Sequence, residues 1–228
     1  MEIYHSLDAI KGLKNAVVTS GTFDGVHIGH QKILARLNEI SALNEGESVV
    51  LTYWPHPRMV VSENSQNLQL LSTIDEKIQL FESLHIDHLV IIPFTRSFSE
   101  LTSVAFIQQI LVEKIGTKKL IIGYDHRFGK NREGSFDFLK ENCSQFGFEV
   151  EEIPRQDIED MAISSSRIRT NLLNGNITEA NELLGRNYSL SGIVVKGKQL
   201  GRTIGFPTAN IQIQEEHKLI PANGSYVI

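Results

Sequence analysis

Two histidines, His27 and His30, stand three residues apart in the stretch SGTFDGVHIGH, which covers residues 20–30. An apolar run precedes the stretch and residues with helical spacing follow it, so the pair is expected where a strand passes into a helix. Such a pair could bind a metal ion, could belong to a purely structural turn, or could hold an anionic phosphate group. The residues around it favour the third interpretation.

A metal site would need more ligands than this pair supplies. No third ligand with a familiar spacing stands nearby, and the HExxH pattern of helical zinc sites is absent. A structural turn would need the glycines but would not need the histidines. A phosphate site uses both, because Gly21, Gly25 and Gly29 let the backbone approach a ligand closely. The start of a helix adds free N–H groups and partial positive charge.

The two imidazoles would then donate hydrogen bonds to phosphate oxygens as negative charge builds up in a transition state. The stretch differs from the common phosphate-binding loops, since the sequence contains neither GxxxxGK[ST] nor GxGxxG.

Hydrophobic periodicity predicts the elements that position this stretch. Strands are expected at residues 15–23, 47–54, 88–93, 118–123 and 148–154. Helices are expected at residues 29–44, from 73 or 75 to 84, 103–115, 135–146, 164–175 and 178–185. The polar stretch from Ser62 to Gln69 is expected to be a loop.

Because strands alternate with helices and the early strands are apolar throughout, the pattern indicates an α/β fold with a parallel sheet covered on both faces. Ligands bind outside the carboxyl ends of the strands in such sheets. The loops of interest therefore follow Phe23, Trp54, Pro93, Gly123 and Pro154, and the unusual residues of the sequence gather in them.

Composition restricts the class of protein. The chain has 228 residues, of which 41% are hydrophobic and 21% charged, as in ordinary soluble globular proteins. A formal net charge of −5 argues against general nucleic-acid binding, which needs a basic face. The single cysteine, Cys143, forms no internal disulfide, and neither a signal peptide nor a membrane-spanning apolar run is present, so we expect a cytoplasmic protein.

Composition changes after Gly185. The following residues lack helical periodicity and carry Gly, Pro and β-branched residues at the spacing of short antiparallel strands. We therefore expect a first domain at residues 1–185 and a small β-rich segment at 186–228.

GTFDGVHIGH, residues 21–30, resembles the HxGH signature of the nucleotidyltransferase superfamily, in the longer form GxFDGxHxGH that is typical of the bacterial bifunctional riboflavin kinase/FAD synthetases. Three further stretches resemble the same family in the same order. They are TYWPHPRMV at 52–60, IIGYDHRFGKNREG at 121–134 and ISSSRIR at 163–169. Taken alone, they could be a proline-locked loop, a basic surface loop and a plain capped helix.

Two residues depart from the family pattern: His126 replaces an aromatic residue and Ser166 replaces a threonine. The resemblance extends into the tail, where GIVVKGKQLGRTIGFPTANI at 192–211 is similar to the start of the riboflavin kinase module with its PTAN motif. In that module Thr208 and Asn210 would help to hold magnesium and ATP phosphates. The remaining strands of the kinase barrel have no counterpart, so riboflavin phosphorylation is not expected of this chain.

The resemblance implies a Rossmann-like nucleotidyltransferase domain with a parallel sheet, followed by an incomplete antiparallel β-barrel segment. It implies transfer of the adenylyl group of ATP to FMN, which forms FAD and pyrophosphate with Mg²⁺ as the cation. The catalytic residues would be His27, His30 and Arg169. ATP and its phosphates would meet Gly21, Phe23, Asp24, Gly25, Gly29, Ser164, Ser165 and, more weakly, Arg167. The flavin would meet Pro55, His56, Pro57, Asp125, Arg127 and Phe128.

Two alternatives remain at this stage. A related transferase could act on another phosphorylated acceptor, but the PHP and PTAN segments speak against it. A catalytically silent flavin-nucleotide binding protein would not need the intact histidine pair.

Overall fold

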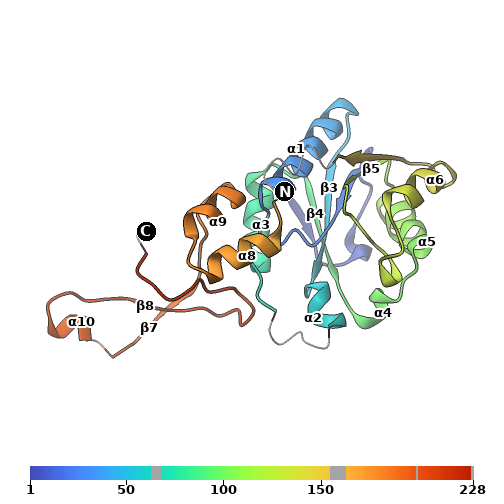
Figure 1. Cartoon of the computed structure of the whole chain (residues 1–228). Helices are drawn as coiled ribbons and strands as arrows, with labels where there is room; N and C mark the ends of the chain where they lie inside the picture. The colour runs from blue at the N-terminus through green and yellow to red at the C-terminus, as the bar shows by residue number, and fades with distance from the viewer. Residues whose placement is uncertain (63–67, 155–162, 199, 227–228) are drawn as a thin grey trace.

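Six parallel strands form the centre of the protein in the computed structural model, which describes residues 1–62, 68–154, 163–198 and 200–226 (Figure 1). The strand order is β1-β4-β3-β2-β5-β6. The strands are β1 (Glu2–Tyr4), β2 (Val17–Ser20), β3 (Ser48–Trp54), β4 (His88–Pro93), β5 (Lys119–Gly123) and β6 (Glu149–Ile153). The predicted α/β fold with a parallel sheet is confirmed, and five of these strands match the predicted ones.

The helices that accompany the sheet also match the predicted segments. They are α1 (Ile28–Leu43), α3 (Ile74–Ser83), α5 (Ser103–Phe106) with its π-helical continuation η3 (Ile107–Ile115), α6 (Phe136–Phe146), α8 (Ser165–Leu173) and α9 (Ile177–Leu184). Short helices that the sequence did not predict are α2 (Pro57–Val61), α4 (Arg96–Ser99) and α10 (Leu200–Thr203). Residues 63–67 and 155–162, which include much of the predicted loops after Ser62 and Pro154, lie outside the described residues.

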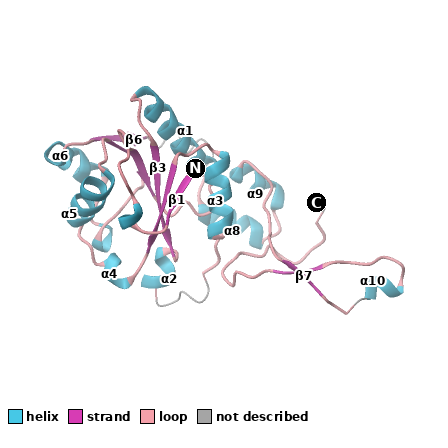
Figure 2. Ribbon diagram, turned by 180° about the vertical axis from the view of Figure 1, so that it is seen from behind, coloured by secondary structure: helices cyan, strands magenta, loops and turns pink. Residues whose placement is uncertain are grey.

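Alternate residues along each central strand face opposite sides of the sheet. In β3, Val49 and Leu51 enter one apolar cluster and Val50 enters the other. Residues of α5, η3 and α6 complete the first cluster, and residues of α1 and α3 complete the second. Figure 2 shows these helices on the two sides of the sheet. Burial on both faces explains why the early strands are apolar at consecutive positions.

The direction of winding changes at β2. The chain proceeds from β2 to β3 and β4 on one side and then returns to place β5 against the other side of β2. Ligands of open parallel sheets bind outside the carboxyl ends of the strands at such a point. Residues 21–30, which we call the histidine loop, follow β2 at this end of the sheet and run into the first turn of α1, where His30 lies.

The tail forms the predicted antiparallel pair, β7 (Ile193–Val195) with β8 (Asn210–Gln212). This hairpin extends away from the sheet, and its side chains are largely exposed (Figures 1 and 2). The chain then returns to the part that contains the six-stranded sheet, where Leu70 and Lys218 form a parallel bridge and Leu219 is fully buried. None of the helices in the described residues is long and apolar enough to cross a membrane.

Candidate active site

The loop between β2 and α1 is folded against residues 70–72. Gly25 adopts a left-handed backbone conformation with φ of 82°, and a Cβ atom there would lie 2.8 Å from Leu71 Cδ1. The Gly25 N–H donates a hydrogen bond of 3.0 Å to Ser72 Oγ. Glycine is therefore required at this position both by its φ angle and by the close approach of Leu71. Gly21 lies at the end of β2, and its N–H donates to the Leu51 carbonyl at 3.0 Å.

His27 is the N-cap residue of α1. Its Nδ1 atom accepts a hydrogen bond of 3.3 Å from the His30 N–H. The neutral ring must then carry its proton on Nε2, which makes Nε2–H a donor. The rings of His27 and His30 stack with centroids 3.7 Å apart and an angle of 14° between their planes.

Burial holds both rings in the neutral form. It lowers the pKa of His27 to about 4, against the opposing effect of the Asp24 carboxylate. Burial also lowers the pKa of His30 well below its usual value, with a further contribution from His27. The rings of Phe23 and His30 pack in a T-shaped arrangement, with centroids 5.2 Å apart and an angle of 72° between their planes. The His30 Nδ1 atom is buried and has no hydrogen-bond partner within the described part of the chain.

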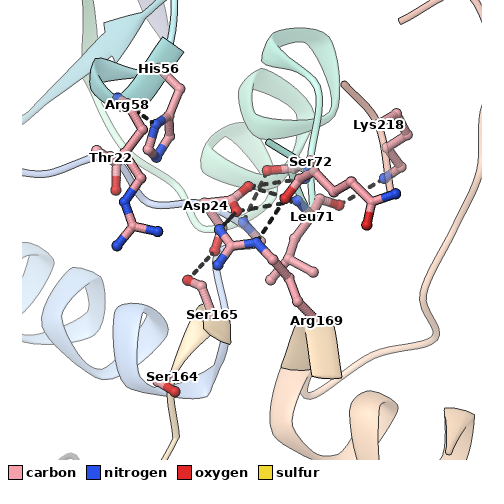
Figure 3. A network of polar contacts seen from close by, with 12 residues as sticks. Thr22, Asp24, His56, Arg58, Leu71, Ser72, Ser164, Ser165, Arg169 and Lys218 are labelled. Carbon is pink, nitrogen blue, oxygen red and sulfur yellow. Dashed lines mark hydrogen bonds and ion pairs between the residues drawn. The ribbon is translucent and has the colours of Figure 1, made fainter. Parts of the chain in front are cut away.

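The serine-rich stretch at the start of α8 contacts the histidine loop, although the two segments are more than 140 residues apart in the sequence. Ser165 Oγ donates to the Asp24 carbonyl at 3.0 Å, and an Arg169 nitrogen lies 2.5 Å from Asp24 Oδ2 (Figure 3). Arg169 Nε donates to the Gln69 carbonyl at 2.8 Å. The predicted phosphate-binding residues of two distant motifs are thus brought together. Gly29 lies buried in the first turn of α1.

The Asp24 carboxylate is 4% exposed, and it holds the histidine loop to two other segments of the chain. It accepts hydrogen bonds from the backbone N–H groups of Leu71 and Ser72 at 2.9 and 3.2 Å, in addition to its ion pair with Arg169. A buried carboxylate needs such partners, because it would otherwise lose its hydration without compensation. Asp24 therefore joins three segments of the site.

Ser164 and Arg167 lie at the more exposed end of the same helix. Ser164 is the N-cap of α8, and its side chain accepts from the Arg167 N–H at 3.2 Å. The Arg167 guanidinium pairs with Glu179 of α9 at 2.6 Å. Ser166, which replaces the threonine of the family pattern, is exposed. Arg169 is thus directed to the histidine loop, whereas Arg167 is directed to α9.

The PHP segment follows β3 and starts helix α2. His56 is its N-cap, with Nδ1 accepting from the Arg58 N–H at 3.1 Å, and Pro57 is the first helical residue. Burial lowers the pKa of His56 to about 4, and the charges of Asp24, Lys77 and Arg169 also act on it. His56 therefore shares its electrostatic environment with the histidine loop. Pro55 is exposed.

The loop after β5 presents some of its predicted residues to solvent and buries another. Asp125 and Arg127 are exposed, whereas Phe128 is 7% exposed and packs in the core against Phe106, with ring centroids 5.4 Å apart. The His126 ring stacks on the Phe128 ring with centroids 5.8 Å apart. The imidazole therefore packs there as the aromatic residue of the family pattern would. Burial lowers the pKa of His126 to about 4, with smaller effects from Arg132 and Arg127.

Thr208 and Asn210 are exposed, and Asn210 lies in β8. Figure 1 shows β8 well away from α1. Asn210 is the first residue of β8 and pairs with Val195. The structure therefore does not bring these two residues together with the other predicted ones.

Two residues that the sequence did not reveal also support the site. Lys77 is 2% exposed, donates to the Thr22 carbonyl and Thr52 Oγ1 at 3.2 and 3.3 Å, and has its pKa lowered to about 8 by burial. Arg186 donates to the Gly25 carbonyl at 2.6 Å. Lys77 lies on a helix with several charged residues, and Arg186 lies at the expected domain boundary. In the sequence, nothing at these positions separates the two residues from ordinary surface charges.

Comparison with known proteins shows the family of this chain. The FAD synthetase family model matches residues 9–167, and the riboflavin kinase family model matches residues 184–228. A bifunctional riboflavin kinase/FMN adenylyltransferase from Buchnera aphidicola subsp. Schizaphis graminum is 41% identical over 226 residues, which are 98% of this chain and 70% of that protein. Proteins of the same name from Listeria monocytogenes and Escherichia coli K12 are 36% and 34% identical, cover 94% of this chain each, and are themselves covered over 67% and 68%.

Among solved structures, a chain from Streptococcus pneumoniae described as a macrolide-efflux protein superposes with a TM-score of 0.86. It is 30% identical, and the match covers 97% of this chain and 71% of that one. The similarity thus extends over the sheet, the histidine loop and the tail.

Proposed function

Because this chain belongs to the FAD synthetase family, we propose that it forms FAD by transferring the adenylyl group of ATP to FMN, and that the site around His27 and His30 performs the transfer. A phosphate oxygen of FMN attacks the α-phosphorus of ATP, and the bond from that phosphorus to the bridging oxygen of pyrophosphate breaks. FMN is the acceptor, and FAD and pyrophosphate are the products.

The attacking phosphate is an anion at neutral pH, so the reaction needs no strong general base. It needs two anions aligned and the charge on the α-phosphate and the departing pyrophosphate stabilised. Neutral His27 fits this requirement, since its Nδ1 accepts from the His30 N–H and its Nε2 therefore carries the proton as a donor. The unpartnered Nδ1 of His30 is consistent with a ring arranged to meet a ligand.

Arg169, Ser164 and Ser165 would hold the departing pyrophosphate. Arg169 supplies a fixed cation beside the start of α8, and a helix start favours negative charge. Arg167 would contribute less, since Glu179 already pairs with it. Gly21, Phe23, Asp24, Gly25 and Gly29 would shape the phosphate loop, with Asp24 acting as its internal anchor.

The flavin would lie toward the loops after β3 and β5. His56, Pro55 and Pro57 would form one side, and Asp125 and Arg127 the other. Phe128 would act from the core by supporting His126 and the loop that carries Asp125.

Magnesium would enter with ATP, as a counter-ion of the phosphates that keeps much of its water shell. Within the described residues there is no cluster of three or more His, Cys, Asp or Glu that could hold a metal ion. The buried Asp24 carboxylate is already engaged by Arg169, Leu71 and Ser72. These observations favour a cation bound to the nucleotide over one resident in the protein.

We also propose that residues 1–185 form the adenylyltransferase domain and that residues 186–228 belong to a riboflavin kinase module. In that module, Thr208 and Asn210 would serve magnesium and ATP in riboflavin phosphorylation. The separation of these two residues from the histidine loop supports two distinct nucleotide sites.

The observation that carries the proposal is the junction of Ser165 and Arg169 with Asp24, because it unites the histidine loop with the serine-rich helix start. The test is incubation with ATP, Mg²⁺ and FMN, followed by separation of FAD and measurement of pyrophosphate. Formation of FAD from FMN supports the proposal. FMN binding without turnover, or turnover with other phosphorylated acceptors alone, contradicts it.

A further inference from the structure

A buried lysine from the kinase-matched segment contacts the backbone that supports the adenylyl-transfer site. Lys218 is 5% exposed, and its Nζ atom donates to the Leu71 carbonyl at 2.8 Å and to Glu76 Oε2 at 2.6 Å. The ammonium also lies 4.5 Å from the centroid of the Tyr188 ring. An ammonium buried in this way is stable only where such partners replace its hydration.

The segment that carries Lys218 runs beside residues 68–72 as a short parallel pairing. The Leu70 N–H donates to the His217 carbonyl at 2.6 Å, and the Leu219 N–H donates to the Leu70 carbonyl at 2.8 Å. His217 Nδ1 lies 3.0 Å from the Leu68 carbonyl. Residues 68–72 are thereby fixed along one side by the tail.

The other side of residues 68–72 faces the site. The N–H groups of Leu71 and Ser72 hold the Asp24 carboxylate, and the Gln69 carbonyl accepts from Arg169 Nε. Asp24 in turn holds the Arg169 guanidinium. Figure 3 shows Lys218 and Arg169 on opposite sides of Leu71, with Asp24 beside it.

We propose that Lys218 is a positioning residue for adenylyl transfer: it fixes Leu71, whose N–H fixes Asp24, which aims Arg169 at the phosphates of ATP. A segment matched by the riboflavin kinase family thus completes the site of the other reaction. This inference rests on the proposed function, since it assigns Arg169 to the phosphates. Lys218 itself touches no substrate.

The test compares three variants of the full chain in FAD formation, with ATP and FMN varied separately. Lys218→Met removes the ammonium and keeps an apolar stem of similar length, and Lys218→Arg restores a cation. Tyr188→Phe is the matched control, because it removes the hydrogen bond from Tyr188 to the Leu219 carbonyl but leaves the Leu71 contact and the aromatic ring in place. Thermal unfolding of each variant is measured in parallel.

We expect Lys218→Met to raise the KM for ATP about tenfold while the KM for FMN changes less than about twofold. Lys218→Arg should recover most of the ATP affinity, and Tyr188→Phe should leave the KM for ATP unchanged. A calorimetric titration with a non-hydrolysable ATP analogue should show the same loss of affinity for Lys218→Met.

A folded Lys218→Met protein with an unchanged KM for ATP would overturn the inference, as would an equal rise in Tyr188→Phe. If Lys218→Met fails to fold, the KM values of Lys218→Arg decide. An unchanged KM for ATP in Lys218→Arg supports the inference, and a large rise in the KM for both ATP and FMN contradicts it. Failure of the unaltered protein to form FAD is a different result, which overturns the proposed function itself.

Discussion

Arg169 and Asp24 lie 145 residues apart in the sequence and form an ion pair of 2.5 Å in which the carboxylate is almost fully buried. The guanidinium also reaches the Gln69 carbonyl, so its orientation is fixed by two acceptors. This pair ties the helix that starts at Ser165 to the loop that ends at His27.

Arg169→Lys should lower kcat/KM for ATP by about 10²-fold, because an ammonium cannot satisfy both acceptors and also face a phosphate as a planar guanidinium does. Arg167→Lys should cause a smaller loss, since Arg167 pairs with the exposed Glu179. Steady-state pyrophosphate release at varied ATP measures both. Equal losses in the two variants would contradict the assignment of Arg169.

His27→Asn and His27→Ala separate the capping role of His27 from its role toward ATP. Asparagine is a good N-cap, so His27→Asn should be more stable than His27→Ala by about 1 kcal/mol. Both variants lack the Nε2–H donor and should lose about 10²–10³ in kcat. Denaturant unfolding and single-turnover FAD formation measure the two effects. Recovery of the rate in His27→Asn would show that only the cap matters.

Gly25→Ala should destabilise the protein by about 3 kcal/mol, since it combines an unfavourable positive φ with a Cβ atom 2.8 Å from Leu71 Cδ1. Gly116→Ala is the matched control, because Gly116 has φ of 71° but nothing within 4 Å of a Cβ position. That variant should cost only about 1 kcal/mol. The midpoints of urea unfolding give the comparison, and equal costs would show that Leu71 moves aside freely.

His126→Phe should make stability less dependent on pH. Burial lowers the pKa of His126 from 6.5 to about 4, so between these values the unfolded chain binds a proton that the folded protein does not. Stability therefore falls as the pH drops from 6.5 toward 4, and phenylalanine removes this contribution. We therefore compare the free energy of unfolding of the variant with that of the unaltered protein at each pH. We expect this difference to favour the variant by on the order of 1–2 kcal/mol more at pH 5 than at pH 7.5.

Urea unfolding at the two pH values measures this difference. A difference between the two proteins that stays the same at pH 5 and pH 7.5 would mean that His126 titrates normally in the fold. FAD formation at pH 7.5 should be retained in the variant, because His126 is packed as an aromatic ring on Phe128.

Local patterns were sufficient for most elements of the fold. The apolar runs at β2 to β5 and the helical spacing of α1 are visible in the sequence, because a sheet buried on both faces and an amphipathic helix need those patterns at neighbouring positions. Strand β6 carries three glutamates and is fully buried only at Ile153, so it lacks such a run. Strand β1 was missed because it has three residues and only Tyr4 among them is buried. Helix α2 was missed because two prolines obscure a first turn that His56 caps and Pro57 starts.

The sequence by itself determined the α/β class, the place of both histidines at the start of α1, and the motifs that resemble the family. Only the tertiary structure decided that Asp24 faces inward to Arg169 and that Lys77, Arg186 and Lys218 support the same loops. The physical reason is that periodicity and capping act between residues a few positions apart. Burial and ion pairing instead depend on which distant segments the packed core brings into contact.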